Sequence, residues 1–173
     1  MDARDPVERL TTSLGKKRMN TFDIMDTWAQ ALVTDPELGT LCSTTFGAPL
    51  KVFVGLDVAH EPEKKDAPYV CLQPAGDERG PEAGEHRWGI IIYFGVHVQA
   101  KPDKTANIVT EPAIVAMERQ FAPAVMRVLA RTTCPPAVGE GTTHPAKGGY
   151  AERDMVVTVR EPNVIGIGSD GWQ

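Results

Sequence analysis

Side chains that can do chemistry gather on one apolar segment, Arg87–Gln99, and on the shorter apolar segment before it. Tyr93 and His97 are four residues apart, so they share one face of an extended strand. Tyr69 and Cys71 share a face of the preceding strand in the same way. If the strands pair, these four side chains could form a small polar pocket. We favour a plainer interpretation, a partly covered sheet face whose polar tips reach solvent.

The four histidines, His60, His86, His97 and His144, do not follow the pattern of a metal site. His86 and His97 differ by an odd number of positions, so on one strand they would point to opposite faces. The other two fall in separate loops. A zinc site needs several converging ligands, usually with a short-spaced pair, and the sequence contains no such pair. We therefore predict no metal ligand.

Motifs that bind cofactors or activate nucleophiles are missing as well. Gly166-x-Gly168-x-x-Gly171 has the letters of a dinucleotide fingerprint, but only two residues follow it. We therefore expect no helix there to hold a pyrophosphate, and the match is accidental. The sequence has no nucleophile elbow, phosphate-binding P-loop or paired-cysteine motif. It predicts no cofactor and no catalytic residue, and hence a protein that is not an enzyme.

The acidic segment Pro74–His86 contains Asp77, Glu78, Glu82 and Glu85. A catalytic pair of carboxyl groups needs a pocket that shifts its pKa values, and a segment rich in glycine and proline is a poor place to build one. We interpret these acids as solvated charges of a flexible hairpin loop. The apolar strands on its two sides are expected to pair in antiparallel orientation.

The bulk properties exclude several classes of protein. The chain has 173 residues, 42% of them hydrophobic, which suits one domain with a real core. Its formal net charge of −5 does not favour nucleic-acid binding, and no apolar run is long enough to span a bilayer. The first residues show no apolar signal segment, so we expect no secretion. Cys42, Cys71 and Cys134 are interpreted as reduced cytoplasmic thiols.

The elements that position these residues are organised around Arg87–Gln99. Its even-numbered positions from Trp88 to Val98 are all apolar and alternate with a second set of residues that includes Ile91. The first half is apolar on both faces, which is typical of a strand covered on both sides. At ~3.3 Å per residue the segment would run about 40 Å, longer than its neighbours could pair. We expect one end to project toward another subunit.

Helical signals mark three regions. The segment Thr21–Val33 is amphipathic, and its first residue is expected to cap it. Asp35-Pro36-Glu37 has the N-cap, first-turn proline and acid that open a second, short helix, which Gly47 ends. A third helix is expected over about Glu111–Arg131, with a kink or restart at Pro123 because proline removes a backbone hydrogen bond.

The remaining segments complete a sheet and its connections. Strands are expected at Leu50–Val54, Tyr69–Gln73 and Met155–Val159, and turns or loops at Gly55–Pro68, Pro74–His86, Lys101–Asn107 and Thr132–Gly149. The last loop is long for a compact domain, which indicates a functional segment or an insertion. The predicted fold class is α+β, a two-layer α/β domain with a mixed, mainly antiparallel sheet of about four strands and helices packed on it. We assign residues 1–19 to a mobile arm, 20–161 to this domain and 162–173 to a Gly-rich tail.

The order of these elements resembles the tail-terminator (tail-completion) proteins of long-tailed bacteriophages. The matching residues are Thr34-Asp35-Pro36-Glu37-Leu38 between the first two helices, then Lys51-Val52-Phe53-Val54 and Ala67-Pro68-Tyr69-Val70. An acidic hairpin, a long apolar strand, an alanine-rich helix and a final strand follow. The resemblance covers roughly residues 20–161.

This resemblance implies a structural virion protein without a cofactor. Members of the family form a six-membered ring on the tail tube, stop its growth and present a surface to the head side. The implied partners are further copies of this chain in a homohexamer, the tail tube protein, and the head–tail connector or head-completion protein. DNA would only pass through the lumen, which suits the acidic balance, and no membrane is involved. The protein would be assembled in the host cytoplasm and located in the neck region of the virion tail.

Assembly contacts are expected in the acidic hairpin, at the end of the central strand and in the 132–149 loop. The residues are Asp77, Glu78, Arg79, Glu82, Glu85, His97, Pro135 and His144. Two alternatives stay open. Another phage neck or adaptor protein would share these features, and capping of tail tubes would distinguish it. A small cytoplasmic enzyme with a pocket near Tyr93 and His97 would lose activity, with folding intact, when either residue is changed.

Overall fold

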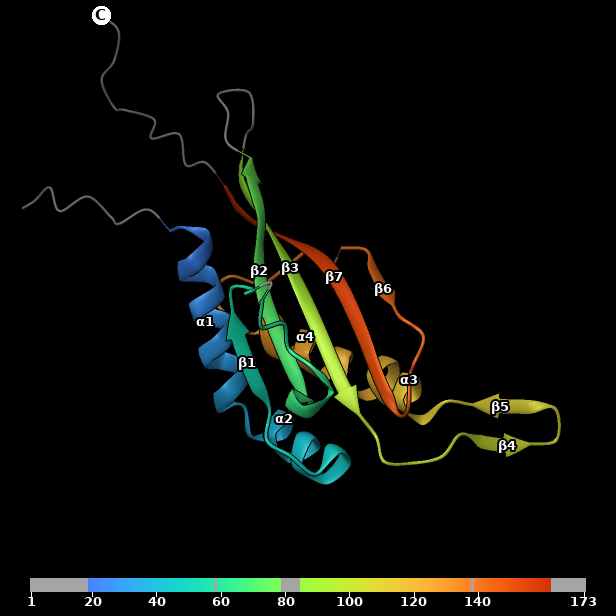
Figure 1. Cartoon of the computed structure of the whole chain (residues 1–173). Helices are drawn as coiled ribbons and strands as arrows, with labels where there is room; N and C mark the ends of the chain where they lie inside the picture. Colours follow the sequence, from blue (N-terminus) through green and yellow to red (C-terminus); the bar gives the residue numbers. More distant parts are fainter. Residues whose placement is uncertain (1–18, 58, 79–84, 138, 163–173) are drawn as a thin grey trace, which may run out of the picture.

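The structure, a computed structural model, describes residues 19–57, 59–78, 85–137 and 139–162. A five-stranded sheet in the order β1–β2–β3–β7–β6 carries helices on one face, and a two-stranded ribbon stands beside it (Figure 1). The predicted fold class, a two-layer α/β domain with a mainly antiparallel sheet, is confirmed, with five strands in place of about four. The arm and tail assigned from the sequence lie outside the described residues, except for Met19 and Pro162.

The element bounds are as follows. The helices are α1 (Thr21–Thr34), α2 (Pro36–Leu41), α3 (Pro112–Ala116) and α4 (Ala122–Ala130). The strands are β1 (Lys51–Val54), β2 (Tyr69–Glu78), β3 (Glu85–His97), β4 (Asp103–Thr105), β5 (Ile108–Thr110), β6 (Gly141–Thr143) and β7 (Tyr150–Pro162). Two π-helical turns, Cys42–Phe46 and Met117–Phe121, and a 3-10 turn, Lys64–Asp66, complete the set. Within the described residues, no helix combines the length and apolar character that crossing a membrane requires.

The central strand β3 is paired along its length. Its register with β7 runs from Glu85 opposite Pro162 to His97 opposite Tyr150, and β2 pairs with most of its other edge. β1 joins β2 in parallel, and the β2–β3, β3–β7 and β6–β7 pairs are antiparallel. The expectation that the central strand outruns its neighbours is therefore wrong, because β2 and β7 are themselves 10 and 13 residues long.

The hydrophobic core lies between the helices and the even-numbered side of β3. That side presents Trp88, Ile90, Ile92, Phe94 and Val96, all with no exposed surface. The strand alternates with period two, so one face of the sheet receives all of these apolar side chains. Burial of this set is the main favourable contribution to folding.

Aromatic side chains fix the helix layer to this core. Trp28 of α1 is fully buried, and its indole N–H donates to the carbonyl oxygen of Cys134 at 2.9 Å. Phe121 meets Phe46 and Phe94 edge to face, with ring centroids 5.5 and 6.3 Å apart. This is a favoured geometry for aromatic pairs. Both helical regions and the segment after α4 are thus held against the same sheet face.

The opposite side of the sheet, which we call the open face, has no α-helix on it among the described residues (Figure 1). Ile91 and Tyr93 of β3 are only half-buried there, and Val156 of β7 is 46% exposed. The expectation of a central strand covered on both faces is therefore wrong. Apolar composition on both sides of a strand does not show whether its second layer comes from the same chain.

The helix ends follow local chemistry. The Asn20 side chain accepts the backbone N–H of Asp23, and the Asp23 carboxylate accepts that of Asn20, both at 3.0 Å. This capping box makes Asn20 the N-cap, and the predicted cap, Thr21, is the first helical residue. Asp35 caps α2 as expected, by accepting a first-turn N–H at 2.8 Å. Gly47 ends the following turn with a φ of 72°, which favours glycine.

The third helical region restarts near Pro123, as expected. α3 ends at Ala116, the turn Met117–Phe121 has π-helical spacing, and α4 begins at Ala122. Proline in the first turn of a helix has no N–H to contribute, so nothing is lost there. The wide turn before it is a common way to interrupt an α-helix locally.

Two segments expected to be loops contain strand residues. Within Pro74–His86, β2 continues to Glu78 and β3 already begins at Glu85, with a bulge at Gly76 whose φ is 130°. Within Thr132–Gly149, β6 pairs with β7 as an edge strand. Both corrections have one cause. Each segment pairs with a neighbouring strand, β2 with β3 and β6 with β7, and these ladders order residues whose own composition is typical of loops.

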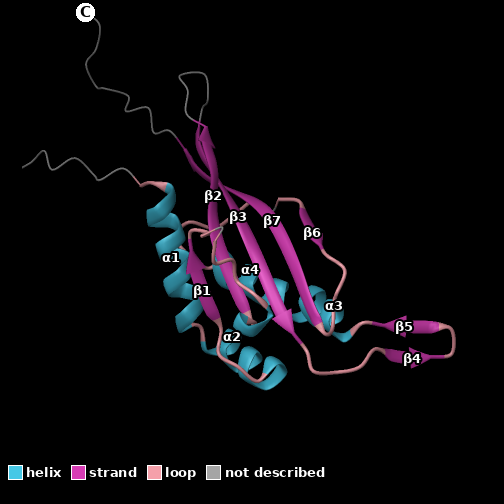
Figure 2. Cartoon of the chain, in the orientation of Figure 1, coloured by secondary structure: helices cyan, strands magenta, loops and turns pink. Residues whose placement is uncertain are grey.

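Lys101–Asn107, expected to be a turn region, belongs mostly to an antiparallel ribbon of β4 and β5 that stands apart from the main sheet (Figure 2). All residues from 101 to 110 are exposed. Ile108 and Val109 expose 66% and 65% of their surface. A two-stranded ribbon alone is marginally stable in water, so a second surface covering it would add stability. We refer to residues 103–110 as the β4–β5 ribbon.

Candidate functional site

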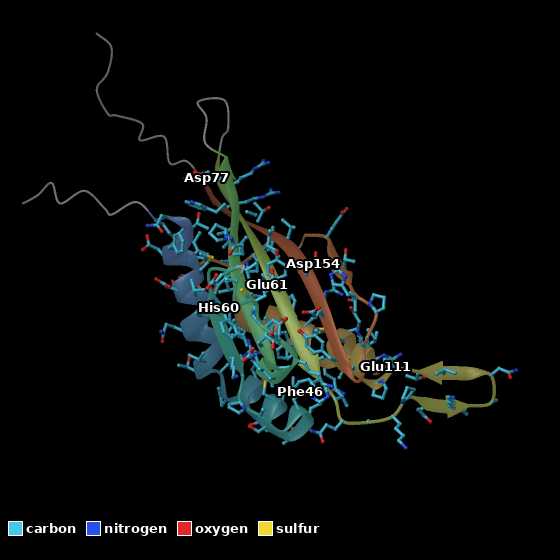
Figure 3. The ribbon with its side chains drawn as sticks, viewed as in Figure 1. Phe46, His60, Glu61, Asp77, Glu111 and Asp154 are labelled. Atoms are coloured by element: carbon cyan, nitrogen blue, oxygen red, sulfur yellow. The ribbon has the colours of Figure 1, made fainter. Side chains whose placement is uncertain are left out.

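A cavity of about 230 Å³ lies on the open face. Its lining comes from β2, β3, β7 and the segments before β2 and after β6, and includes Glu61, which Figure 3 labels together with the nearby Asp154. Strand alternation places the side chains, because Cys71, Tyr93 and Asp154 stand in one row across β2, β3 and β7. The cavity therefore depends on pairing between segments far apart in the sequence.

Tyr69, Tyr150 and Glu152 form a hydrogen-bonded cluster beside this cavity. The Tyr150 hydroxyl donates to Glu152 Oε1 at 2.6 Å, and the Tyr69 hydroxyl lies 3.0 Å from the same oxygen and 3.0 Å from the Tyr150 oxygen. Burial is the largest cause that raises the pKa of both tyrosines, and the Glu152 carboxylate adds to it, while the hydrogen bond with Tyr150 partly lowers the pKa of Tyr69. Both phenols stay neutral at ordinary pH, and the cluster connects β2 with β7 across β3.

Gly95 of β3 makes room for this connection. It stands between Tyr69 and Glu152 in the register, and a Cβ atom placed on it would lie only 2.1 Å from the Tyr69 ring. The ring therefore covers the bare backbone of the central strand, an arrangement in which an aromatic side chain compensates for a glycine in a sheet. Tyr69 is 3% exposed, so its ring is fixed there.

The His144 ring and the Asp154 carboxylate are hydrogen-bonded on the same face, with 2.7 Å between Nε2 and Oδ1. A histidine–carboxylate pair orients the general base in catalytic triads, but a triad also needs an activated nucleophile. The thiol in this cavity is Cys71, and burial raises its pKa to about 11, so the thiolate is disfavoured. The pair instead holds the segment after β6 to β7. The backbone N–H of His144 also donates to the backbone carbonyl oxygen of Glu152 at 2.9 Å.

Metal binding finds no support in the described part of the chain. No group of three or more histidine, cysteine, aspartate or glutamate side chains there is arranged to hold an ion. His86 and His97 do lie on opposite faces of β3, at an odd separation, as strand alternation requires.

Of the four residues that the sequence suggested for a pocket, three line the observed cavity. Tyr69, Cys71 and Tyr93 line the cavity, whereas His97 does not and His144 takes its place. His97 lies at the last position of β3, where burial and the positive charge of Lys64 lower its pKa. Sequence spacing carried no signal for His144, because its position depends on the pairing of β6 with β7.

The acidic residues proposed as assembly contacts lie at one end of the sheet. Asp77 and Glu78 close β2, and Glu85 opens β3. Asp77 lies near the upper end of β2 in Figure 3, with its carboxylate 3.4 Å from His86 Nε2. Arg79 and Glu82 lie outside the described residues.

The other proposed contacts are not part of that acidic end. His97 ends β3 at the opposite end of the strand, which spans ~40 Å. Pro135 is exposed in the segment after α4, and His144 lies on the open face. The structure therefore does not bring the described members of the set into one patch. A role of each in assembly stays a prediction.

The tyrosine cluster predicts how stability changes at high pH. Because folding raises the pKa of Tyr69 and Tyr150, the unfolded chain releases these protons first, from about pH 10. Stability is complete below that pH and falls as the pH rises above it. The fall should be shallower in Tyr150→Phe than in the wild type, measured by urea unfolding up to about pH 11. The other titrating groups are common to both proteins, so parallel declines would contradict this expectation.

No protein-family model and no curated protein matches the chain. Among solved structures, a chain described as "Virion of native gene transfer agent (GTA) particle" is similar to 79% of this chain, over 92% of its own length. The two chains are 18% identical in sequence and superimpose with a TM-score of 0.45.

Proposed function

We propose that this protein is a structural subunit of a phage-type virion. In this proposal it forms a ring at the head-proximal end of a tail tube, stops the tube from growing, and joins the tail to the head-side connector. The observation that carries the proposal is the β4–β5 ribbon. It projects beside the sheet and exposes two large apolar side chains, Ile108 and Val109 (Figure 1).

The ribbon suits a subunit that completes its burial in an assembly. Exposed apolar side chains on a marginally stable ribbon gain free energy when another surface covers them. The element order supports the same role, because it resembles the tail-terminator family over the α1–α2 junction, β1 and the entry to β2. The implied homohexamer and the implied tube and connector partners belong to this proposal.

The open face supports a structural role over an enzymatic one. Tyr69 and Tyr150 are held neutral, and the pKa of the cavity thiol Cys71 is raised. The histidine–aspartate pair of this face holds an edge strand in place. The tyrosine cluster and the histidine–aspartate pair connect segments of the sheet, and none of these groups is arranged as an activated nucleophile.

A closed ring explains how such a subunit ends a tube. Each subunit uses one patch against a different patch of its neighbour, and the rotation between them limits the number of subunits. Once the ring is docked, it hides the growing end of the tube. Its other side is then available to the head-side connector.

The test removes this protein from an assembling phage. We expect tails of unregulated length that do not join heads, seen by electron microscopy, and recovery when the wild-type protein is supplied. Normal tails joined to heads in the absence of the protein would overturn the proposal. A purified ring that binds connectors but leaves tail tubes uncapped would instead indicate a neck adaptor.

A further inference from the structure

The two faces of the β4–β5 ribbon differ in chemistry. Opposite residues of an antiparallel pair share a face, and the register places Lys104 opposite Val109 and Thr105 opposite Ile108. One face therefore combines a cation with an apolar side chain. The other combines Ile108 with threonines and the Asp103 carboxylate. The two apolar side chains are almost equally exposed, at 65% and 66%.

An uncharged groove of about 470 Å³ lies along α1, α2 and the segment before β1. We call it the α1–α2 groove. Its lining has no charged side chain and includes Val33, Pro36, Thr40, Thr44, Pro49 and Leu50. Val33 is 55% exposed, although its neighbour Leu32 is buried. The groove thus offers a second apolar surface that is open to solvent in the single chain.

The region that carries this groove is acidic. Residues 19–50 contain four carboxylates and no lysine, arginine or histidine. Asp35 and Glu37 flank the groove residue Pro36, and the Glu37 side chain is 78% exposed. Arg131 approaches them at 3.8 and 3.9 Å, and Arg127 lines the same adjoining hollow, so these two arginines offset part of the negative charge of the region. The ribbon segment 101–110, with two lysines and one aspartate, is complementary in charge.

The ribbon and the groove lie on opposite sides of the molecule (Figure 1). The ribbon extends past α3 on one side, and α1 and α2 form the other. A contact between two different patches on opposite sides of identical chains is heterologous, the kind that builds rings. A self-complementary dimer would instead bring the same patch of two copies together.

We propose that the Lys104–Val109 face of the ribbon docks into the α1–α2 groove of the next copy of this chain. Val109 enters the apolar groove, and Lys104 lies toward Glu37, whose side chain is the exposed carboxylate beside it. The inference rests on the proposed ring function, for which it names the subunit contact. It selects one ribbon face, so Val109 is buried in the assembly and Ile108 is not.

Disulfide trapping tests this contact in the full-length protein. Val33→Cys protein is mixed with differently tagged Val109→Cys protein at low ionic strength and oxidised. A disulfide needs Cβ atoms about 3.5–4.5 Å apart, so it reports which ribbon face meets the groove. We expect a mixed dimer with Val109→Cys and only the wild-type background with Ile108→Cys, the matched control. The natural cysteines Cys42, Cys71 and Cys134 are buried, so that background is expected to be low.

Imaging of wild-type protein on tail tubes separates the two proposals. Capped tubes without the Val109–Val33 cross-link would overturn this contact and leave the proposed function standing. The cross-link without capped tubes would support the contact and contradict the tail-end function. Equal cross-linking by Ile108→Cys, or cross-linking between two Val109→Cys chains alone, would also overturn the docking of this ribbon face.

Discussion

Ile92→Asp should lower the free energy of unfolding by several kcal/mol and abolish most of the folded protein. Ile92 is fully buried on the helix side of β3, between Leu72 and Met155 in the register. A carboxylate there would have to ionise in an apolar core or stay protonated with its hydrogen bonds unmade. Total stability of a domain is only ~5–15 kcal/mol, so this loss is a large share of it.

Ile91→Asp is the matched control for that change. It alters the adjacent residue of the same strand by the same chemistry, but its side chain lies half-buried on the open face. We expect a much smaller loss, because water can reach the new carboxylate. Denaturant and thermal unfolding of both variants decide the question. Equal melting of Ile92→Asp and the wild type would show that this side of β3 is not the core.

Gly95→Ala should destabilise the protein by overpacking, by about 1–3 kcal/mol. The new methyl would lie 2.1 to 2.8 Å from three atoms of the Tyr69 ring, inside any real contact distance. The ring cannot move away freely, because it is buried and its hydroxyl lies 3.0 Å from both Tyr150 and Glu152. Relief of the clash would therefore break the cluster that connects β2 with β7.

Two comparisons test the cause of that loss. Gly39→Ala places a methyl in open space in the short helix α2, and we expect it to stabilise by roughly 0.5–1 kcal/mol through helix propensity. In a Tyr69→Ala background, Gly95→Ala should cost little, because the ring that it meets is gone. A double-mutant cycle measures this coupling. Simply additive losses would mean that the two residues do not conflict.

Parts of this protein could be predicted because their signals are local. The start of α2 at Asp35-Pro36, the end of the following π-helical turn at Gly47 and the restart near Pro123 depend on interactions within a few residues. The alternation of Arg87–Gln99 likewise placed the core side of β3 correctly, because the period of a strand is set by its own backbone. The class of the fold follows from these elements.

Features that depend on pairing with another segment of the chain were not predicted from the sequence. β6 and the parts of β2 and β3 within Pro74–His86 were expected to be loop, since their composition is typical of loops and only pairing with a neighbouring strand orders them. The same holds for His144, which enters the cavity only through that pairing, and for His97, which stays outside it. The β4–β5 ribbon was not predicted either, because each of its strands has only three residues and lies among turn-forming residues.

By itself, the sequence determined which residues form the helices and which side of the central strand is apolar, because capping and periodicity act over one or two turns. The tertiary structure alone decided that one face of the sheet stays open, that Gly95 lies under the Tyr69 ring, and that the ribbon and the α1–α2 groove lie on opposite sides. Those outcomes depend on how distant segments pack, and composition does not record the distance between segments in space.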